Sequence, residues 1–173
     1  NWKKHPGLQN SYMRWQNQLP LYNMRLQNLS AAVIRPQLPE VAGRVAKGRA
    51  GHDRVAARLN ACAWLAVPEA LGPEERAPDS IQFNLSGDWT DAQARAFQIE
   101  AKRRGVTVQV FGLSEDNARA FWNWKFLGEV PELPLTRAML MRACDVRLPT
   151  RLTNAELDFI ASALVAAAED VKG

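Results

Sequence analysis

The chain has 173 residues, of which 47% are hydrophobic and 23% charged, with ten Gly, ten Pro, two Cys and a net charge of +4. This length is enough for one domain that buries roughly 70% of the surface its unfolded chain exposes, so no disulfide or structural metal is needed. The composition excludes a disordered tail, a collagen-like fibre and a disulfide-stapled miniprotein.

Residues 1–22 form a polar lead-in with several aromatic side chains, and Pro20 marks its end. The first basic residues are followed by polar ones, so a signal peptide is not predicted. The longest uncharged apolar run, 159–168, is shorter than the roughly 18 residues that a membrane-spanning helix needs. We therefore expect a cytoplasmic protein without a membrane segment.

Basic side chains are concentrated in residues 1–62, which hold ten Lys or Arg and only two acidic residues. Such a bias is typical of a surface for nucleic acid or another polyanion, or of one face of a larger assembly. Since no zinc-finger, RRM or KH signature accompanies the charge, the assembly is favoured over nucleic acid.

Residues 23–63 are predicted to form linking helices. Helical periodicity starts at about residue 24, Pro36 and Pro39 interrupt it, and a second helix runs from about residue 40 to 63. Glycines inside the second helix each cost about 1 kcal/mol relative to Ala, which argues against an unbroken helix. His52 lies on this basic helix and is expected to be a solvated surface residue.

Residues 64–111 alternate between strand and helix patterns. Strands are predicted at 64–68, 81–85 and 106–111. The helix between the second and third strands has a capping box, formed by Thr90 and a glutamine three residues later, and a glycine stop at Gly105. These elements predict an α+β domain over residues 64–173, in which helices cover one sheet face.

The last third of the chain has three further predicted elements. Ser114 is expected to cap a helix that carries the two nearby tryptophans, and 135–144 forms another short helix. An extended piece at 145–148 leads to the closing helix. Its start is marked by Thr153 and, three residues later, Glu156, the spacing of a capping box.

Chemical motifs are scarce. Cys62 and Cys144 lie far apart without a CxxC pair, so we expect two reduced core thiols. Neither His5 nor His52 belongs to a metal-binding or catalytic-triad pattern, and no phosphate-binding glycine motif follows a strand.

One polar pair stands at the predicted start of the first helix. Asn23 and Arg25 would lie near unpaired backbone N–H groups, which already favour an anion. An amide donor and a guanidinium added there would suit a phosphate or carboxylate. The alternative is an asparagine N-cap beside a surface arginine, and the local pattern leaves both open.

A family resemblance rests on this segment and on several pieces C-terminal to it. Residues 22–32, Y-N-M-R-L-Q-N-L-S-A-A, resemble the N-Y-R-M-x-x-L-Q-A-A segment of the DegT/StrS-type sugar aminotransferases. Further similar pieces come in the family's order: Gln37-Leu38, the strand 80–85, the helix end at 102–106, and 148–157. Together they cover about residues 11–170.

The resemblance implies a fold, a cofactor and partners. Members are pyridoxal-phosphate (PLP) enzymes of the aspartate aminotransferase fold, so this chain would be the small C-terminal domain of a fold-type I enzyme, a short, mostly antiparallel sheet covered by helices and preceded by linking helices. Asn23 would reach the cofactor phosphate of the neighbouring subunit, and Arg25 would lie on the substrate side. The implied partners are a sugar nucleotide and a second subunit in a homodimer.

The sequence also departs from the family pattern. Met24 replaces an aromatic residue of the motif, and Phe111 stands where many members have a substrate-contacting His. The family's Schiff-base lysine, in an S-x-S-x-x-K context before a Gly-Glu-Gly-Gly run, lies in a large domain that precedes this segment, and neither context occurs here. We therefore predict that no catalytic residue lies in this chain and that it does not transaminate alone.

A second hypothesis comes from another class. The chain would be a non-catalytic binding or scaffold module whose basic first third binds an acidic partner or nucleic acid. Association that weakens with salt would distinguish it, since neutralised phosphates release counterions.

Overall fold

The computed structural model describes residues 7, 13–14, 28–72 and 76–173. Four strands form one sheet in the order β1-β2-β4-β3, with every neighbouring pair antiparallel. The strands are β1 (Leu65–Ala66), β2 (Ser80–Leu85), β3 (Gln109–Val110) and β4 (Ala143–Arg147). This confirms the predicted α+β class and its short antiparallel sheet.

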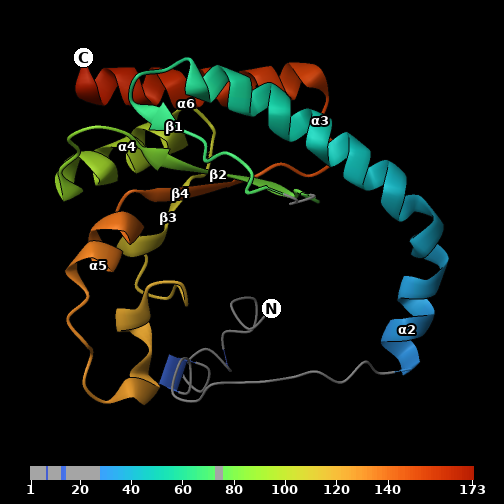
Figure 1. Cartoon of the computed structure of the whole chain (residues 1–173), viewed down its shortest axis with the longest axis horizontal. Coiled ribbons are helices and arrows are strands. Elements are labelled where there is room, and N and C mark those ends of the chain that lie inside the picture. Colours follow the sequence, from blue (N-terminus) through green and yellow to red (C-terminus); the bar gives the residue numbers. More distant parts are fainter. Residues whose placement is uncertain (1–6, 8–12, 15–27, 73–75) are drawn as a thin grey trace.

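Three helices cover one face of the sheet: α3 (Val41–Asn60), α4 (Asp91–Arg103) and α6 (Asn154–Lys172) (Figure 1). Alternate residues of β2 point to this side, so that Ile81, Phe83 and Leu85 are buried. The phenyl rings of Phe83 and Phe97 meet edge to face with centroids 6.2 Å apart. The hydrophobic core therefore lies between the helices and the sheet.

The first helices leave this body as an arm. The helix α2 (Asn28–Ile34) and the 3-10 helix η2 (Arg35–Glu40) continue α3 away from the sheet, and neither contains a buried residue (Figure 1). Pro36 and Pro39 fall in η2, as expected for residues that interrupt an α-helix.

The predicted second helix is confirmed as α3, which is unbroken from Val41 to Asn60 although its glycines lower helix propensity. Gly48 is needed there because a Cβ on this residue would lie 2.5 Å from the carbonyl oxygen of Pro78. Tertiary packing therefore offsets the helix-propensity cost of this glycine.

Both predicted capping boxes are confirmed. Thr90 caps α4 through Gln93, and Thr153 caps α6 through Glu156, with side chain and backbone bonded reciprocally in each case. Gly105, with a φ of 89°, follows the end of α4 as predicted.

The segment between β3 and β4, residues 111–142, differs in part from its prediction. Ser114 caps no helix, and its hydroxyl bonds to the Asp116 carboxylate at 2.7 Å. The segment contains the 3-10 turns η3 (Phe111–Leu113), η4 (Phe121–Asn123) and η5 (Lys125–Leu127), and the predicted short helix is present as α5 (Pro134–Leu140). The Trp124 ring stacks on Phe126, and Arg137 lies 4.5 Å from the Trp122 ring centroid.

The predicted strand at 106–111 is reduced to two paired residues. Val106 and Val108 are buried, which explains the alternating pattern, but only Gln109 and Val110 pair with β4. Alternation reports which side chains are buried, and pairing also requires a neighbouring strand in register.

Candidate functional site

The two residues that the sequence singled out, Asn23 and Arg25, lie outside the described residues. Their roles therefore stay predictions. Phe111, which stands where the resemblance implies a substrate-contacting His, is buried under the Arg119 guanidinium, 4.4 Å from its ring centroid.

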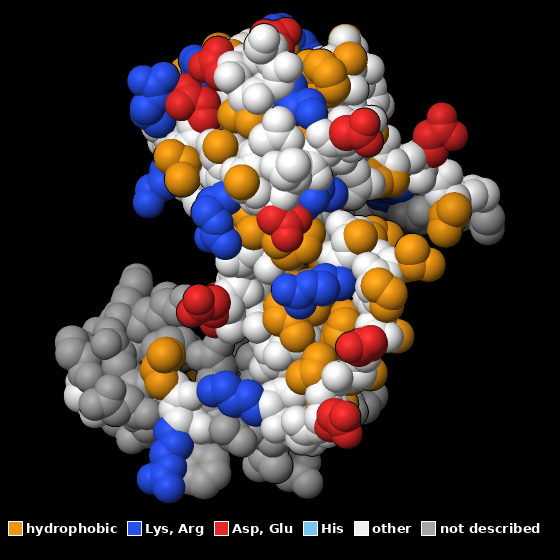
Figure 2. Space-filling model, turned by 90° about the vertical axis from the view of Figure 1, so that its left-hand side faces the viewer, with side chains coloured by type: hydrophobic (Ala, Val, Ile, Leu, Met, Phe, Trp, Pro, Cys, Tyr) orange, Lys and Arg blue, Asp and Glu red, His pale blue; other side chains and the backbone are white. Residues whose placement is uncertain are grey.

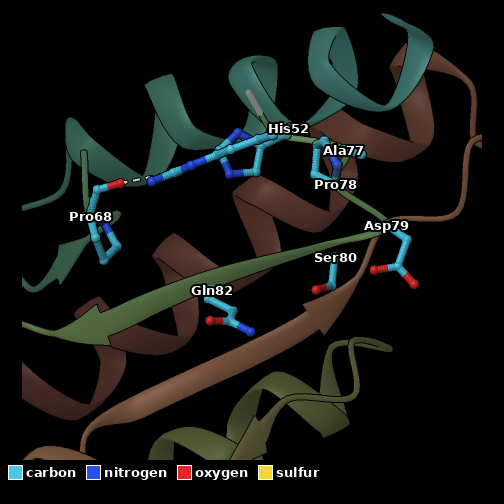
Figure 3. A pocket seen from close by; sticks show the side chains of 8 residues that line it. His52, Pro68, Ala77, Pro78, Asp79, Ser80 and Gln82 are labelled. Atoms are coloured by element: carbon cyan, nitrogen blue, oxygen red, sulfur yellow. Dashed lines mark hydrogen bonds between the residues drawn. The ribbon is translucent and has the colours of Figure 1, made fainter. Parts of the chain in front are cut away.

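A pocket of about 410 Å³ lies between α3 and the free edge of β2 (Figure 3). It forms because β1 is too short to pair with the first residues of β2. Its lining residues are His52, Pro68, Arg76, Ala77, Pro78, Asp79, Ser80 and Gln82.

Two arginines fix one wall of this pocket. Arg76 donates from Nη1 to the carbonyl oxygen of Pro68 at 3.3 Å, and Arg49 donates from Nε to the carbonyl oxygen of Arg76 at 2.5 Å. The loop that leads into β2 is thereby tied to α3 and to the segment that follows β1.

His52 lines this pocket from α3 and is only 8% exposed. The prediction of a solvated surface histidine was therefore wrong. The loop at 76–79 packs over α3 close to Gly48, and it covers a ring that the helix alone would leave in water. No local pattern in the sequence signals this, because the covering residues lie more than twenty positions away.

Among the described residues, the pocket has polar groups but no catalytic pair. The Nδ1 atom of His52 lies 3.2 Å from Oδ1 of Asp53. Within the described part of the chain, no hydrogen bond joins this ring to a serine or cysteine, as an activated nucleophile would require. These side chains suit the binding of a polar group more than covalent chemistry.

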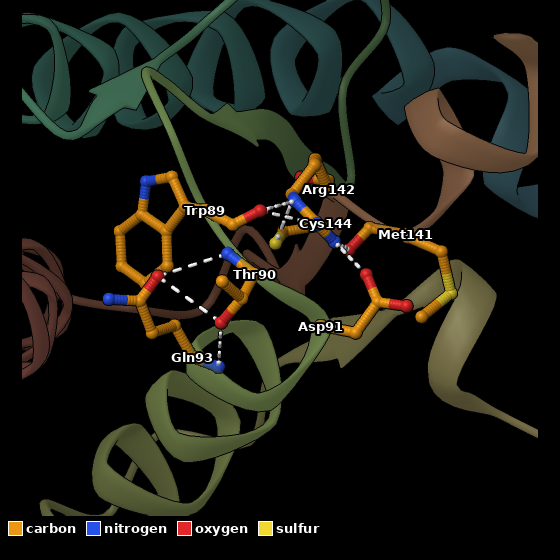
Figure 4. A network of polar contacts seen from close by, with 7 residues as sticks. All are labelled: Trp89, Thr90, Asp91, Gln93, Met141, Arg142 and Cys144. Carbon is orange, nitrogen blue, oxygen red and sulfur yellow. Dashed lines mark hydrogen bonds and ion pairs between the residues drawn. The ribbon is translucent and has the colours of Figure 1, made fainter.

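Arg142, just before β4, holds a second polar network (Figure 4). Its guanidinium donates from Nε to the carbonyl oxygen of Trp89 at 2.9 Å, and from Nη1 to the Asp91 carboxylate at 2.7 Å. Both acceptors lie where α4 begins, beside the Thr90 capping box. The network is therefore a structural clamp between the sheet and α4.

The two cysteines are free and buried, as predicted. Burial raises the pKa of the Cys144 thiol, and Sγ donates to the Arg142 carbonyl oxygen at 3.6 Å. A protonated, enclosed thiol is a poor nucleophile, so Cys144 is part of the core.

The described residues do not provide a PLP site. Such a site needs a lysine for the Schiff base and a carboxylate against the pyridinium nitrogen. Lys47, Lys102 and Lys125 are exposed. Lys172 donates to the Asp88 carbonyl oxygen and lies 5.1 Å from the Trp64 ring centroid. Across the described ranges no group of three or more His, Cys, Asp or Glu could hold a metal ion, and no helix is long and apolar enough to cross a membrane.

Several basic side chains of α3 have partners within the chain. Arg54 binds the Asp158 carboxylate, Arg58 donates to the Ser162 hydroxyl, and Arg44 pairs with Glu40. The positive charge of this helix is thus partly used to hold α6, which weakens the case for a nucleic-acid surface.

Large apolar side chains are exposed on two parts of the molecule. On the arm they are Leu29, Val33, Ile34 and Leu38, and Val41 at the start of α3 adjoins them. On the 111–142 segment they are Phe126, Leu127, Val130, Leu133, Leu135 and Met139. In the lower half of Figure 2, orange side chains gather where this segment lies. Apolar surface of this extent is typical of contact with another polypeptide.

Comparison with known proteins gives a family and a fold. The DegT/DnrJ/EryC1/StrS aminotransferase family model matches residues 3–165. A search of curated proteins finds no match.

Solved structures share the fold at low sequence identity. Spr1654 from Streptococcus pneumoniae, named as a sugar aminotransferase, matches in its apo form with a TM-score of 0.70 and 18% identity, over 89% of this chain and 38% of its own. Its PLP form matches with a TM-score of 0.69 and 16% identity, over 96% of this chain and 46% of its own. The structure of 3-amino-5-hydroxybenzoic acid synthase matches with a TM-score of 0.65 and 17% identity. The match covers 93% of this chain and 46% of the synthase chain. The chain therefore spans less than half the length of these proteins.

Proposed function

The chain belongs to the DegT/DnrJ/EryC1/StrS aminotransferase family, and from this premise we propose that it is the C-terminal segment of a PLP-dependent aminotransferase acting on a keto-sugar nucleotide or related keto-cyclitol. The observation that carries the proposal is the family match over residues 3–165, in a chain that spans only 38–46% of the solved structures it resembles. Aminotransferases of this family depend on PLP, and Spr1654 has been solved in a PLP form.

In this proposal the Schiff-base lysine belongs to a preceding large domain. When bound, the cofactor would supply the electron sink for moving the amino group. The residues of this chain would bind and orient: Asn23 would donate to the cofactor phosphate, and Arg25 would hold an anionic part of the substrate. The surroundings of the described lysines support a site completed from outside, since none faces an acidic group in an enclosed pocket.

The partners follow from the same proposal. The exposed apolar side chains of the arm and of the 111–142 segment would contact the large domain and a second subunit of a homodimer. The free, buried Cys62 and Cys144 are in keeping with a reducing compartment, and we place the protein in the cytoplasm.

The test is an absorption spectrum of the chain with added PLP, followed by borohydride reduction, intact-mass analysis and peptide mapping. We expect no stoichiometric pyridoxyl adduct at one lysine, and transaminase activity only when the preceding domain is supplied. PLP can also react non-specifically with exposed lysines and give scattered, sub-stoichiometric adducts. A heat-unfolded sample treated in the same way measures this background. A single stoichiometric adduct on the folded chain would refute the proposal, because a lysine of this chain would then serve the cofactor.

A further inference from the structure

Two arginines of the 111–142 segment lie with their guanidinium groups over aromatic rings. The Cζ atom of Arg119 is 4.4 Å from the centroid of the Phe111 ring, and Cζ of Arg137 is 4.5 Å from the centroid of the Trp122 ring. Such a contact uses the face of the guanidinium and leaves its N–H groups, which lie in its plane, for other partners. The rings therefore position both cations without using their donors.

These donors are unbonded within the described part of the chain. Neither Arg119 nor Arg137 makes a hydrogen bond or ion pair there, and both side chains are exposed. Arg54 and Arg142, in contrast, hold carboxylates of neighbouring elements. A guanidinium that is positioned but unbonded is ready to donate to an anion from outside the chain.

The acidic side chains of the same segment do not occupy these donors. The Asp116 carboxylate accepts a hydrogen bond from the Ser114 hydroxyl. Glu115, Glu129 and Glu132 are exposed, and in the described structure none of them pairs with either arginine. An anion that reaches the two guanidinium groups thus displaces water and no carboxylate of the segment.

Hydrogen bonds fix the turn that carries Arg119. The backbone N–H of Arg119 donates to the side-chain oxygen of Asn117 at 2.9 Å. The Nδ2 group of Asn123 donates to the carbonyl oxygens of Ser114 and Asn117 at 2.9 and 3.0 Å. The guanidinium of Arg119 therefore projects from a braced turn, which reduces the entropy lost when it binds.

Arg137 reaches the same part of the segment from α5. The N–H of Met141 bonds to the carbonyl oxygen of Arg137 at the end of this helix. Met141 also packs against η3, since a Cβ added to Gly112 would lie 2.5 Å from its Sδ atom. Phe111, the ring under Arg119, begins η3. Both cations therefore flank one 3-10 turn.

The cation and the exposed apolar side chains of α5 lie on different sides of this helix. Leu135 and Met139 are four positions apart and share one side. Arg137 lies midway between them in the sequence, which turns it about 200° around the axis from each. The donors of Arg137 thus stay available when the apolar side of α5 contacts another polypeptide.

We propose that Arg119 and Arg137 together bind a diphosphate group, with one phosphate at each guanidinium. A planar guanidinium matches two oxygens of one phosphate, and two of them beside one turn favour a ligand with two linked phosphates over a single one. The diphosphate comes either from a sugar-nucleotide substrate or from a free nucleoside diphosphate. Its assignment to the substrate rests on the proposed function, whereas the site itself does not.

The experiment is an NMR titration of the full chain with inorganic pyrophosphate, and with inorganic phosphate as the single-group probe, at constant ionic strength. Arg119→Gln and Arg137→Gln each remove one guanidinium. Arg119→Lys and Arg137→Lys keep a cation over the ring and lose the paired donors, so they replace any Gln variant that fails to fold. Arg95→Gln, on the exposed side of α4, removes the same charge elsewhere and is the matched control. Thermal unfolding checks the fold of every variant.

We expect saturable shifts at the amides of Phe111 and Arg119 and at the indole N–H of Trp122, with pyrophosphate bound about tenfold more tightly than phosphate. Each substitution of Arg119 or Arg137 should weaken pyrophosphate binding about tenfold and remove most of this preference, because one of two charge-assisted contacts is lost. Arg95→Gln should bind both probes like the unsubstituted chain.

Three results would overturn the proposal: no saturable shift, equal affinity for the two probes, or the same loss in Arg95→Gln as in the Arg119 and Arg137 variants. The source of the diphosphate is identified in the protein that includes the preceding domain. Competitive inhibition of transamination by pyrophosphate identifies the substrate, and binding that leaves the rate unchanged identifies a free nucleoside diphosphate. The PLP reduction assay reads lysines and the titration reads these arginines, so either proposal can fail alone.

Discussion

Arg54 on α3 and Asp158 on α6 form a two-armed ion pair, in which Nε and Nη2 of the arginine each lie 2.7 Å from a different carboxylate oxygen. The two residues are 104 positions apart in the sequence. The hydrogen bonds from Arg54 hold the pKa of the Asp158 carboxyl below its usual range. This pair links two helices whose apolar faces pack in the core.

The pair should make stability depend on pH at the acid end. Because the pKa of Asp158 is lower in the folded than in the unfolded chain, its contribution is fully present above the unfolded value of about 3.9 and is lost as pH falls through the folded value. Asp158→Asn should therefore be slightly less stable at neutral pH and lose less stability on acidification. Urea unfolding at a series of pH values measures both.

The side chains of Glu100 and Glu156 also have lowered pKa values, through Arg103 and Thr153 respectively, so some acid sensitivity should remain in Asp158→Asn. Arg54→Gln serves as the reciprocal variant. An unchanged acid slope in both variants would show that the ion pair does not persist in solution.

The close approach of α3 to the Pro78 carbonyl predicts opposite effects for two glycines of one helix. Gly48→Ala places a Cβ 2.5 Å from that oxygen and should destabilise the chain by about 1–3 kcal/mol. Gly43→Ala meets nothing within 4 Å and should stabilise by about 0.5–1 kcal/mol. The denaturant midpoints of the two variants measure the change in stability. Equal effects of the two substitutions would mean that α3 does not contact the loop at Pro78.

Replacing Arg142 should release the start of α4. Arg142→Lys keeps the charge but cannot reach Trp89 and Asp91 together, so we expect a loss of about 1–3 kcal/mol. Arg95→Lys, on the exposed side of α4, is the control and should change little. Hydrogen exchange at the first turn of α4 should quicken in Arg142→Lys alone, and protection equal to that of the control would contradict the clamp.

The roles proposed for Asn23 and Arg25 are tested in the protein that includes the PLP-binding domain. Asn23→Ala should weaken cofactor affinity, and Arg25→Ala should raise KM for the keto substrate, each by about tenfold or more, since each removes a hydrogen bond to a charged group. Ser30→Ala, exposed on α2, is the control. Unchanged cofactor affinity and KM would remove both residues from the site.

The sequence predicted correctly those helix starts that depend only on residues close together in the chain. Thr90 and Thr153 mark helix starts because capping needs only a residue three positions away, and both predictions are confirmed. The prediction of a helix for the aromatic residues after Ser114 was wrong. Their packing depends on Arg137, which lies later in the 111–142 segment. Apolar and aromatic spacing alone cannot separate a run of 3-10 turns from a helix.

The candidate sites show the same division. His52 gave no signal of burial, because the loop that covers it is placed by the β2 pairing. Asn23 and Arg25 were found by resemblance, and they lie outside the described residues.

The pairing of α3 with α6 has a consequence for how the chain is made. During synthesis α3 emerges with Val55 and Leu59 uncovered, and the helix that packs against it begins only at Asn154. The β2 strand likewise waits for β4, more than fifty residues later, before it gains a second neighbour. Closing contacts between such distant segments is slow, so the nascent chain stays open until α6 leaves the ribosome, and its apolar surfaces are a target for chaperones in that interval.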